Sequence, residues 1–317
     1  MLALAVALAL SGCGGTVSRR QGENPPYTEQ AQEAAKKADP YERRGYSMDD
    51  KPTERQVQIT RDLIEEANYR DSGADRVLAG EGWPSWRLFD FITHAETALD
   101  RMRERYGVAF RALNGGYVLP GVGYPYYEFR MAATEGPLAG RECRYRYLSP
   151  DQAKGPAEES DTYIDLLRHD EYVAYVFTAI DRAFAEHPGM HGAADVTSTG
   201  NDGLWAEMPD PKAPLKELLP HLASGIDIYI SPASKVDREE YDAFNKSLGE
   251  ELAGLKTDTS YELVYINRVT DPYKDKPFSF AAGYAARVAA NSDESYIKWD
   301  QYVSVHRSGE VTWDDNE

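Results

Sequence analysis

The chain has 317 residues, and its 53 acidic and 35 basic side chains give a formal net charge of −18 at pH 7. Nucleic-acid phosphates need a basic footprint on the protein, so this charge argues against a nucleic-acid partner. The length is sufficient for one large hydrophobic core or for two smaller ones. Only two cysteines, Cys13 and Cys143, are present.

The chain opens with an apolar run, Leu2 to Leu10, which is followed by Ser11, Gly12 and Cys13. A membrane span needs about 20 apolar residues, whereas this short run suits the apolar region of a secretory signal. The small residues Ser11 and Gly12 would let a peptidase reach the backbone before Cys13. This pattern resembles the lipobox of bacterial lipoproteins, which ends in the cysteine that receives lipid.

The resemblance implies a signal peptide over residues 1–12 and lipidation of Cys13, with a diacylglyceryl group (palmitate is typical) on its sulfur. We then expect a lipoprotein that is held at the cell membrane by its lipid anchor and faces outward, because two acyl chains give stable anchoring. No intramolecular disulfide is expected, since Cys143 is the remaining thiol. Export signals normally begin with a basic segment, which is missing before Leu2, so we expect the true start codon upstream.

Residues 13–55, which begin with the lipidated cysteine, have the composition of a flexible tether. The segment is polar, contains Pro and Gly, and has too few aliphatic residues to offset the entropy of ordering. As a coil it would span roughly 35–40 Å. Its eight basic and eight acidic residues cancel, so the net charge of −18 belongs to residues 56–317. We divide that body into a first unit, 56–212, and a second unit, 213–317.

Secondary structure in the body follows from periodicity and from capping signals. Apolar residues at helical spacing predict helices over 53–67, 84–106, 170–186 and 237–255. Alternating or β-branched runs predict strands over 108–113, 126–133, 142–148, 226–230, 261–269, 278–290 and 296–306.

A helix followed by antiparallel strands therefore occurs twice, over 84–148 and 237–306. This predicts an α+β fold with two helix-plus-antiparallel-sheet units after a disordered N-terminal tether. The layout resembles cystatin-like folds. The segment from Ala98 to Gly107, with the strand after it, is also similar to uncharacterised lipoproteins of Gram-positive bacteria, and this resemblance brings no activity with it.

Catalytic and metal-binding motifs are weak. His187 and His191 flank Pro188 and Gly189, which break a helix, so the pair lacks the helical spacing of a zinc protease; Asp195 could be a third ligand only in a loop. Alternation places Cys143 on the inner face of its strand, as a small buried hydrophobe rather than a nucleophile. We therefore predict no catalytic residue, no metal ligand and no cofactor.

Tyrosines are abundant, and several of them crowd one segment that is rich in Gly and Pro. These tyrosines form our candidate binding patch: Tyr117, Tyr124, Tyr126 and Tyr127. Aromatic side chains on a loop can bind sugars, peptides or partner proteins. Packing within a sheet would explain the same residues without any ligand.

The sequence thus favours a non-enzymatic binding or interaction module at the cell surface, with a protein, a peptide or a wall component as its partner. One alternative is the solute-binding lipoprotein of a transporter. Such proteins need alternating strands and helices around parallel sheets, and this chain has adjacent strands instead. A further alternative is a cell-wall or metal-dependent hydrolase that uses His187, His191 and Asp195.

Overall fold

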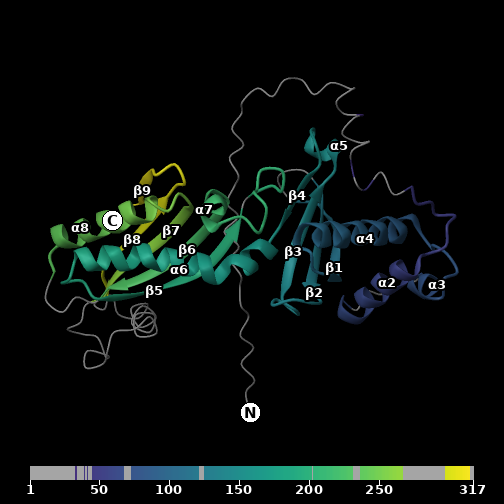
Figure 1. Ribbon diagram of the computed structural model, residues 1–317, viewed down its shortest axis with the longest axis horizontal. Coiled ribbons are helices and arrows are strands. Elements are labelled where there is room, and N and C mark those ends of the chain that lie inside the picture. The colour runs from purple at the N-terminus through teal and green to yellow at the C-terminus, as the bar shows by residue number, and fades with distance from the viewer. Residues whose placement is uncertain are drawn as a thin grey trace, which may run out of the picture.

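The computed structural model describes residues 33, 39, 41, 45–67, 73–120, 125–201, 203–230, 236–266 and 297–314. The predicted signal peptide, Cys13 and the predicted strand 278–290 lie outside these residues. Two sheets lie side by side along the longest axis of the molecule, each with helices packed on it (Figure 1). The α+β class predicted from the sequence is confirmed.

The first sheet has four antiparallel strands in the order β1-β2-β3-β4. Its strands are β1 (Phe110–Val118), β2 (Tyr126–Ala133), β3 (Glu142–Leu148) and β4 (Glu158–Asp161). The long helix α4 contacts β1 and β2. The helices of this unit are α2 (Glu54–Ala67), α3 (Ala74–Leu78), α4 (Trp86–Tyr106) and the short α5 (Pro150–Ala153).

Helix α4 is where the sequence predicted it, because both of its ends carry capping signals. The Ser85 side chain accepts a hydrogen bond from the backbone N–H of Leu88 at 3.2 Å. At the other end, Gly107 adopts a left-handed conformation with a φ of 71°. The predicted apolar stripe faces the sheet and is buried: Leu88, Ile92, Ala95, Leu99, Met102 and Tyr106.

Helix α6 (Tyr163–Glu186) begins earlier than the predicted residue 170. Its start is held by Asp161, which accepts the backbone N–H of Tyr163 at 2.6 Å. Asp161 ends the short polar strand β4, which has no hydrophobic alternation and was therefore missed. The helix start that we predicted at Asp170 lies well inside α6.

The second sheet is mixed and has the order β5-β6-β7-β8-β9. Strands β6 and β7 are parallel, although antiparallel neighbours were predicted, because helix α8 carries the chain back across the sheet between them. The elements of this unit are β5 (Gly192–Asn201), α7 (Leu215–Leu218), η2 (Leu219–His221), β6 (Leu222–Ile230), α8 (Arg238–Ala253), β7 (Asp258–Ile266), β8 (Ile297–Val305) and β9 (Val311–Asp314).

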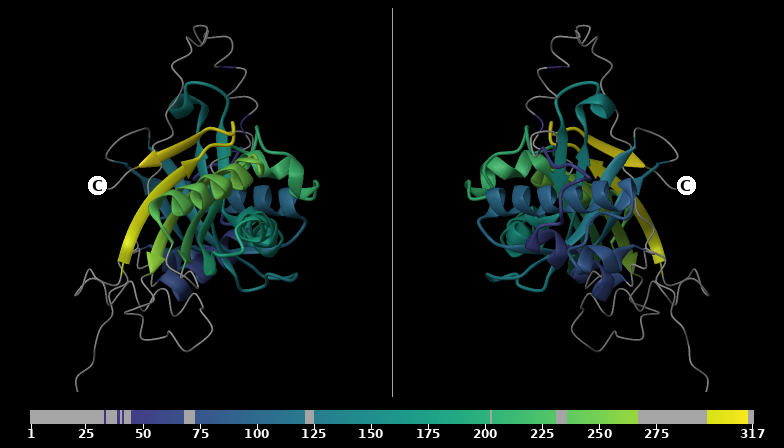
Figure 2. Two further views of the ribbon diagram at one scale, coloured as in Figure 1. Left: turned by 90° about the vertical axis from the view of Figure 1, so that its left-hand side faces the viewer. Right: turned by 90° about the vertical axis from the view of Figure 1, so that its right-hand side faces the viewer.

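Two strands of the second sheet, β5 and β9, were not predicted. Strand β5 is largely polar and lies at the edge of the sheet, where one face stays in contact with water. It pairs with β6, so the second sheet starts before the predicted boundary between 212 and 213. Helix α6 lies beside α8 on the second sheet (Figure 2). It packs on β5 and also contacts β3 of the first sheet.

The two units are joined by a buried carboxylate, Asp161. The Tyr106 hydroxyl at the end of α4 donates to Asp161 Oδ2 at 2.8 Å. The indole N–H of Trp205, which follows β5, donates to the same Oδ2 at 2.6 Å. Trp205 also donates its backbone N–H to the Glu159 carbonyl at 2.8 Å. A single hydrophobic cluster then continues from the first sheet into the second.

Two residues of the predicted tether, Asp39 and Tyr41, pack on the body. Asp39 is 3% exposed and accepts a hydrogen bond from the Tyr147 hydroxyl. The Tyr41 ring stacks on that of Tyr147, with 3.8 Å between ring centroids. Aromatic packing and a buried hydrogen bond, which a count of aliphatic residues overlooks, order these positions. The capping box of Thr53 and Gln56 at the start of α2 is formed as predicted.

Candidate functional site

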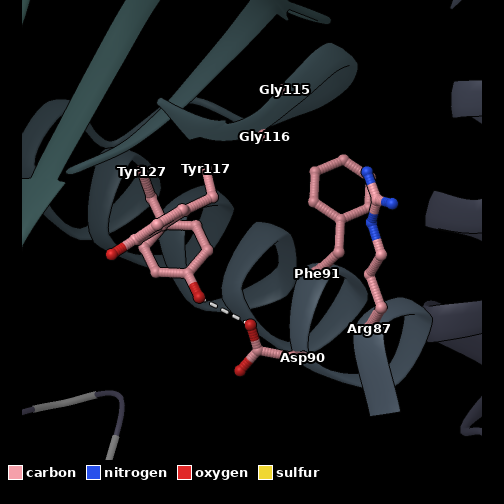
Figure 3. A pocket seen from close by; sticks show the side chains of 7 residues that line it. All are labelled: Arg87, Asp90, Phe91, Gly115, Gly116, Tyr117 and Tyr127. Atoms are coloured by element: carbon pink, nitrogen blue, oxygen red, sulfur yellow. Dashed lines mark hydrogen bonds between the residues drawn. The ribbon is translucent and has the colours of Figure 1, made fainter. Parts of the chain in front are cut away.

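A small pocket opens between the first turns of α4 and the far end of strand β1. We call it the aromatic pocket, and its volume is about 170 Å³. Figure 3 shows Tyr117 and Tyr127 on one side, with Phe91 and Arg87 on the other side. The lining residues are Arg87, Asp90 and Phe91 from α4, Gly115, Gly116 and Tyr117 from β1, and Tyr127 from β2.

Two consecutive glycines, Gly115 and Gly116, form part of the wall of this pocket. A Cβ atom on Gly115 would lie 2.5 Å from Phe129 Cδ1 and 2.9 Å from the Glu128 carbonyl oxygen, so a larger residue does not fit there. A Cβ atom on Gly116 would meet nothing within 4 Å. The two positions leave bare backbone beside α4, and a ligand can approach backbone of this kind closely.

The polar end of the pocket is a hydrogen-bonded pair from two elements. The Tyr127 hydroxyl donates to Asp90 Oδ2 at 2.5 Å, as the dashed line in Figure 3 shows. Burial, together with this bond to a carboxylate, raises the pKa of Tyr127, so its hydroxyl stays a donor. Asp90 Oδ1 also lies 3.4 Å from Nδ1 of His94, one helical turn further along α4.

The stacked rings of His94 and Tyr41 support the ring of Tyr127. His94 stacks on Tyr127 with 4.1 Å between ring centroids, and Tyr41 stacks on His94 at 4.9 Å. The Tyr41 hydroxyl lies 2.9 Å from that of Tyr145, which in turn donates to Glu159 Oε1 at 2.6 Å. The pocket wall is therefore a preorganised surface, and the Tyr41 ring helps to support it.

The structure brings together only part of the predicted tyrosine patch. Tyr117 and Tyr127 are register partners on neighbouring strands, and their rings meet edge to face at 5.2 Å. Tyr126 points to the opposite face of the sheet, where the Arg146 guanidinium lies 5.2 Å from its ring. Tyr124 lies outside the described residues.

The α4 half of the pocket was not predicted from the sequence. Arg87, Asp90 and Phe91 precede the tyrosines by some 30 residues, and only the packing of α4 on the sheet brings them together. One available signal was the polar pair of Asp90 and His94, which has helical spacing and borders the apolar stripe.

Exposed hydrophobic side chains lie next to the pocket residues along the chain. Trp86, the neighbour of Arg87, is 64% exposed, and Tyr117 is 50% exposed. Leu119, two residues after Tyr117, is 74% exposed. Large exposed hydrophobic side chains beside a pocket are typical of a surface that a partner covers.

The other candidate residues do not assemble into a site. Cys143 is a buried free thiol, and burial raises its pKa, which opposes thiolate chemistry. The His187 ring packs edge to face on Phe244, and Asp195 belongs to strand β5. No group of three or more His, Cys, Asp or Glu side chains within the described residues is arranged to hold a metal ion.

No protein-family model, curated protein or solved structure matches this chain. Across the part of the chain that the structure describes, no helix has the length and apolar character that a membrane crossing requires.

Proposed function

We propose that this protein is a lipid-anchored lipoprotein, facing outward from the cell membrane, whose body is a non-enzymatic module that binds a protein or peptide partner. The pattern Leu10-Ser11-Gly12-Cys13 supports the anchor. The aromatic pocket, with exposed Trp86 and Leu119 nearby in the chain, supports the binding role.

The composition of the aromatic pocket carries the second half of this proposal. Trp, Tyr and Arg are the residues that most often dominate the binding energy of protein interfaces. Arg87 and Tyr117 line the pocket, and the exposed Trp86 is the chain neighbour of Arg87. The pocket is smaller than the several hundred Å³ that are usual for a small-molecule site. It suits a single side chain of a partner better than a whole soluble ligand.

The chemistry of the walls indicates which side chain this is. An aromatic or aliphatic group would pack between Tyr117 and Phe91, and a polar tip on that group could reach Asp90. Arg87, exposed at the rim, would meet an acidic neighbour on the partner.

Site-specific photocrosslinking in living cells tests the binding role. A photoreactive benzophenone amino acid replaces Tyr117, and the matched control carries it at Tyr175, an exposed tyrosine on α6. We expect a protein adduct from position 117 that Asp90→Ala reduces and that position 175 does not give. No adduct, or the same adduct from both positions, would contradict a partner at this pocket.

The anchor is tested separately with an alkyne-bearing palmitate analogue supplied to the cells. We expect the wild type and Cys143→Ser to incorporate the label and to fractionate with membranes. Cys13→Ser should lose the label and the membrane association. Labelling that persists in Cys13→Ser would refute lipidation at this residue without bearing on the pocket.

A further inference from the structure

A second and larger groove lies between helix α8 and the last two strands, far in the fold from the aromatic pocket. Its volume is about 540 Å³, within the range of sites that hold a small ligand. We call it the amide groove, and it is lined by Arg238, Asp242, Asn245, Lys246 and Glu250 of α8, Gln301 of β8, and Val311 and Trp313 of β9.

The deepest lining residues of the amide groove are two primary amides. Asn245 is 1% exposed and Gln301 is 7% exposed. Asn245 Nδ2 donates to Gln301 Oε1 at 2.5 Å, and Asn245 Oδ1 accepts the Tyr261 hydroxyl at 2.7 Å. The two amides thus form a buried and rigid floor, which fixes the position of the exposed side chains around it.

An aromatic ring forms part of the wall. Trp313 pairs with Val303 across β8 and β9, which places its side chain on the face toward α8. A Cβ atom on Gly249 would lie only 3.1 Å from Trp313 Cη2, so the glycine lets the ring approach the helix. Trp313 nevertheless stays 38% exposed, which leaves part of its surface for a ligand.

The charges around the groove balance. Arg238 Nε donates to Asp242 Oδ1 at 2.8 Å, and Lys246 Nζ lies 3.9 Å from Glu250 Oε1. These four side chains of the lining contribute two positive and two negative charges in a protein whose net charge is −18. A site of this composition offers donors and acceptors but no net attraction for an anion or a cation.

We propose that the amide groove binds a neutral oligosaccharide. The exposed charged side chains of α8 in the lining can hydrogen-bond adjacent hydroxyls as both donors and acceptors, and the Trp313 ring can pack on the C–H face of a sugar. The α8 residues from Arg238 to Glu250 span about 18 Å, which accommodates an extended chain of sugars rather than one ring. This inference is independent of a partner at the aromatic pocket.

Calorimetric titration of the full chain tests the proposal, in a detergent that has no sugar head group to compete. The probes are maltotriose and the trimer of N-acetylglucosamine, both neutral. We expect at least one to bind with a Kd of about 1 mM or tighter. Trp313→Ala should weaken that binding roughly tenfold, the effect of losing one aromatic packing contact.

Two further variants make the result specific. Lys246→Ala removes one exposed donor, leaves the core unchanged and should weaken binding several-fold. This variant keeps the proposal testable if Trp313→Ala does not fold. Tyr175→Ala, which truncates an exposed aromatic side chain of α6 outside this groove, should bind like the wild type. No binding of either trimer to the wild type at about 10 mM would overturn the proposal. An equal loss in Tyr175→Ala would overturn it as well.

Discussion

Replacing Asp165 with asparagine should change how the stability of the protein depends on pH. Asp165 lies in the first turn of α6, where it is 9% exposed. Burial raises its pKa to about 7, while the Asn201 side chain, which donates to Asp165 Oδ1 at 3.0 Å, opposes part of that shift. The neighbouring carboxylate of Asp161 raises the pKa further, and Arg144 lowers it.

The direction of the effect follows from proton linkage. The folded protein holds the Asp165 proton up to about pH 7, whereas the unfolded chain releases it near the ordinary value of 3.8. Between these values the native state binds more protons than the unfolded state, so the free energy of unfolding falls as pH rises. A shift of about three units corresponds to at most about 4 kcal/mol of stability, lost from near pH 4 to above pH 7.

Urea unfolding of the wild type and of Asp165→Asn at pH 4.5 and at pH 8 measures this effect. The amide still accepts the Asn201 hydrogen bond but does not titrate, so the variant should lose less stability between the two pH values. Asp170→Asn, an exposed residue of the same helix, should behave like the wild type. An equal pH dependence in the wild type and Asp165→Asn would refute the reasoning.

Two further substitutions test the surroundings of the aromatic pocket. Gly115→Ala should destabilise the protein by about 1–3 kcal/mol in urea unfolding, because its Cβ would lie 2.5 Å from Phe129 Cδ1. An unchanged unfolding midpoint would show that Phe129 and the strand move apart without a cost in stability. Tyr147→Phe removes the hydroxyl that donates to Asp39, so chymotrypsin should cleave after Tyr41 several-fold faster; an unchanged rate would mean that ring stacking alone holds the segment.

The elements that could be predicted from the sequence are those with a long apolar stripe and clear ends. Helix α4 has both, and helix α8 has an apolar stripe together with Asp237, which accepts the N–H of Glu240 at 2.9 Å. Strands β4, β5 and β9 could not be predicted in this way. The first two are largely polar, and β4 and β9 have only four residues each, too few to establish a period.

The sequence also indicated part of the candidate site. The tyrosines drew attention to the turn between β1 and β2, and Tyr117 and Tyr127 do lie together. Their register could not be predicted, because a bulge between Ala112 and Asn114 shifts the pairing of β1 with β2 by one residue. A shift of one residue moves each side chain of a strand to the opposite face of the sheet. The contribution of α4 depends on tertiary packing, which no local pattern encodes.

The buried joint between the units determines how the two proposed sites would work together. Asp161 accepts hydrogen bonds from Tyr106 of the first unit and from Trp205, which lies four residues after the end of β5 in the second sheet. Opening the joint would separate the Trp205 indole from the buried Asp161, and the loss of that hydrogen bond costs about 1–3 kcal/mol. A partner in the aromatic pocket and a saccharide in the amide groove would therefore be held in a fixed relation. If the two ligands belong to one larger partner, binding at one site would raise the effective concentration of the other ligand at its own site, although the two sites do not touch.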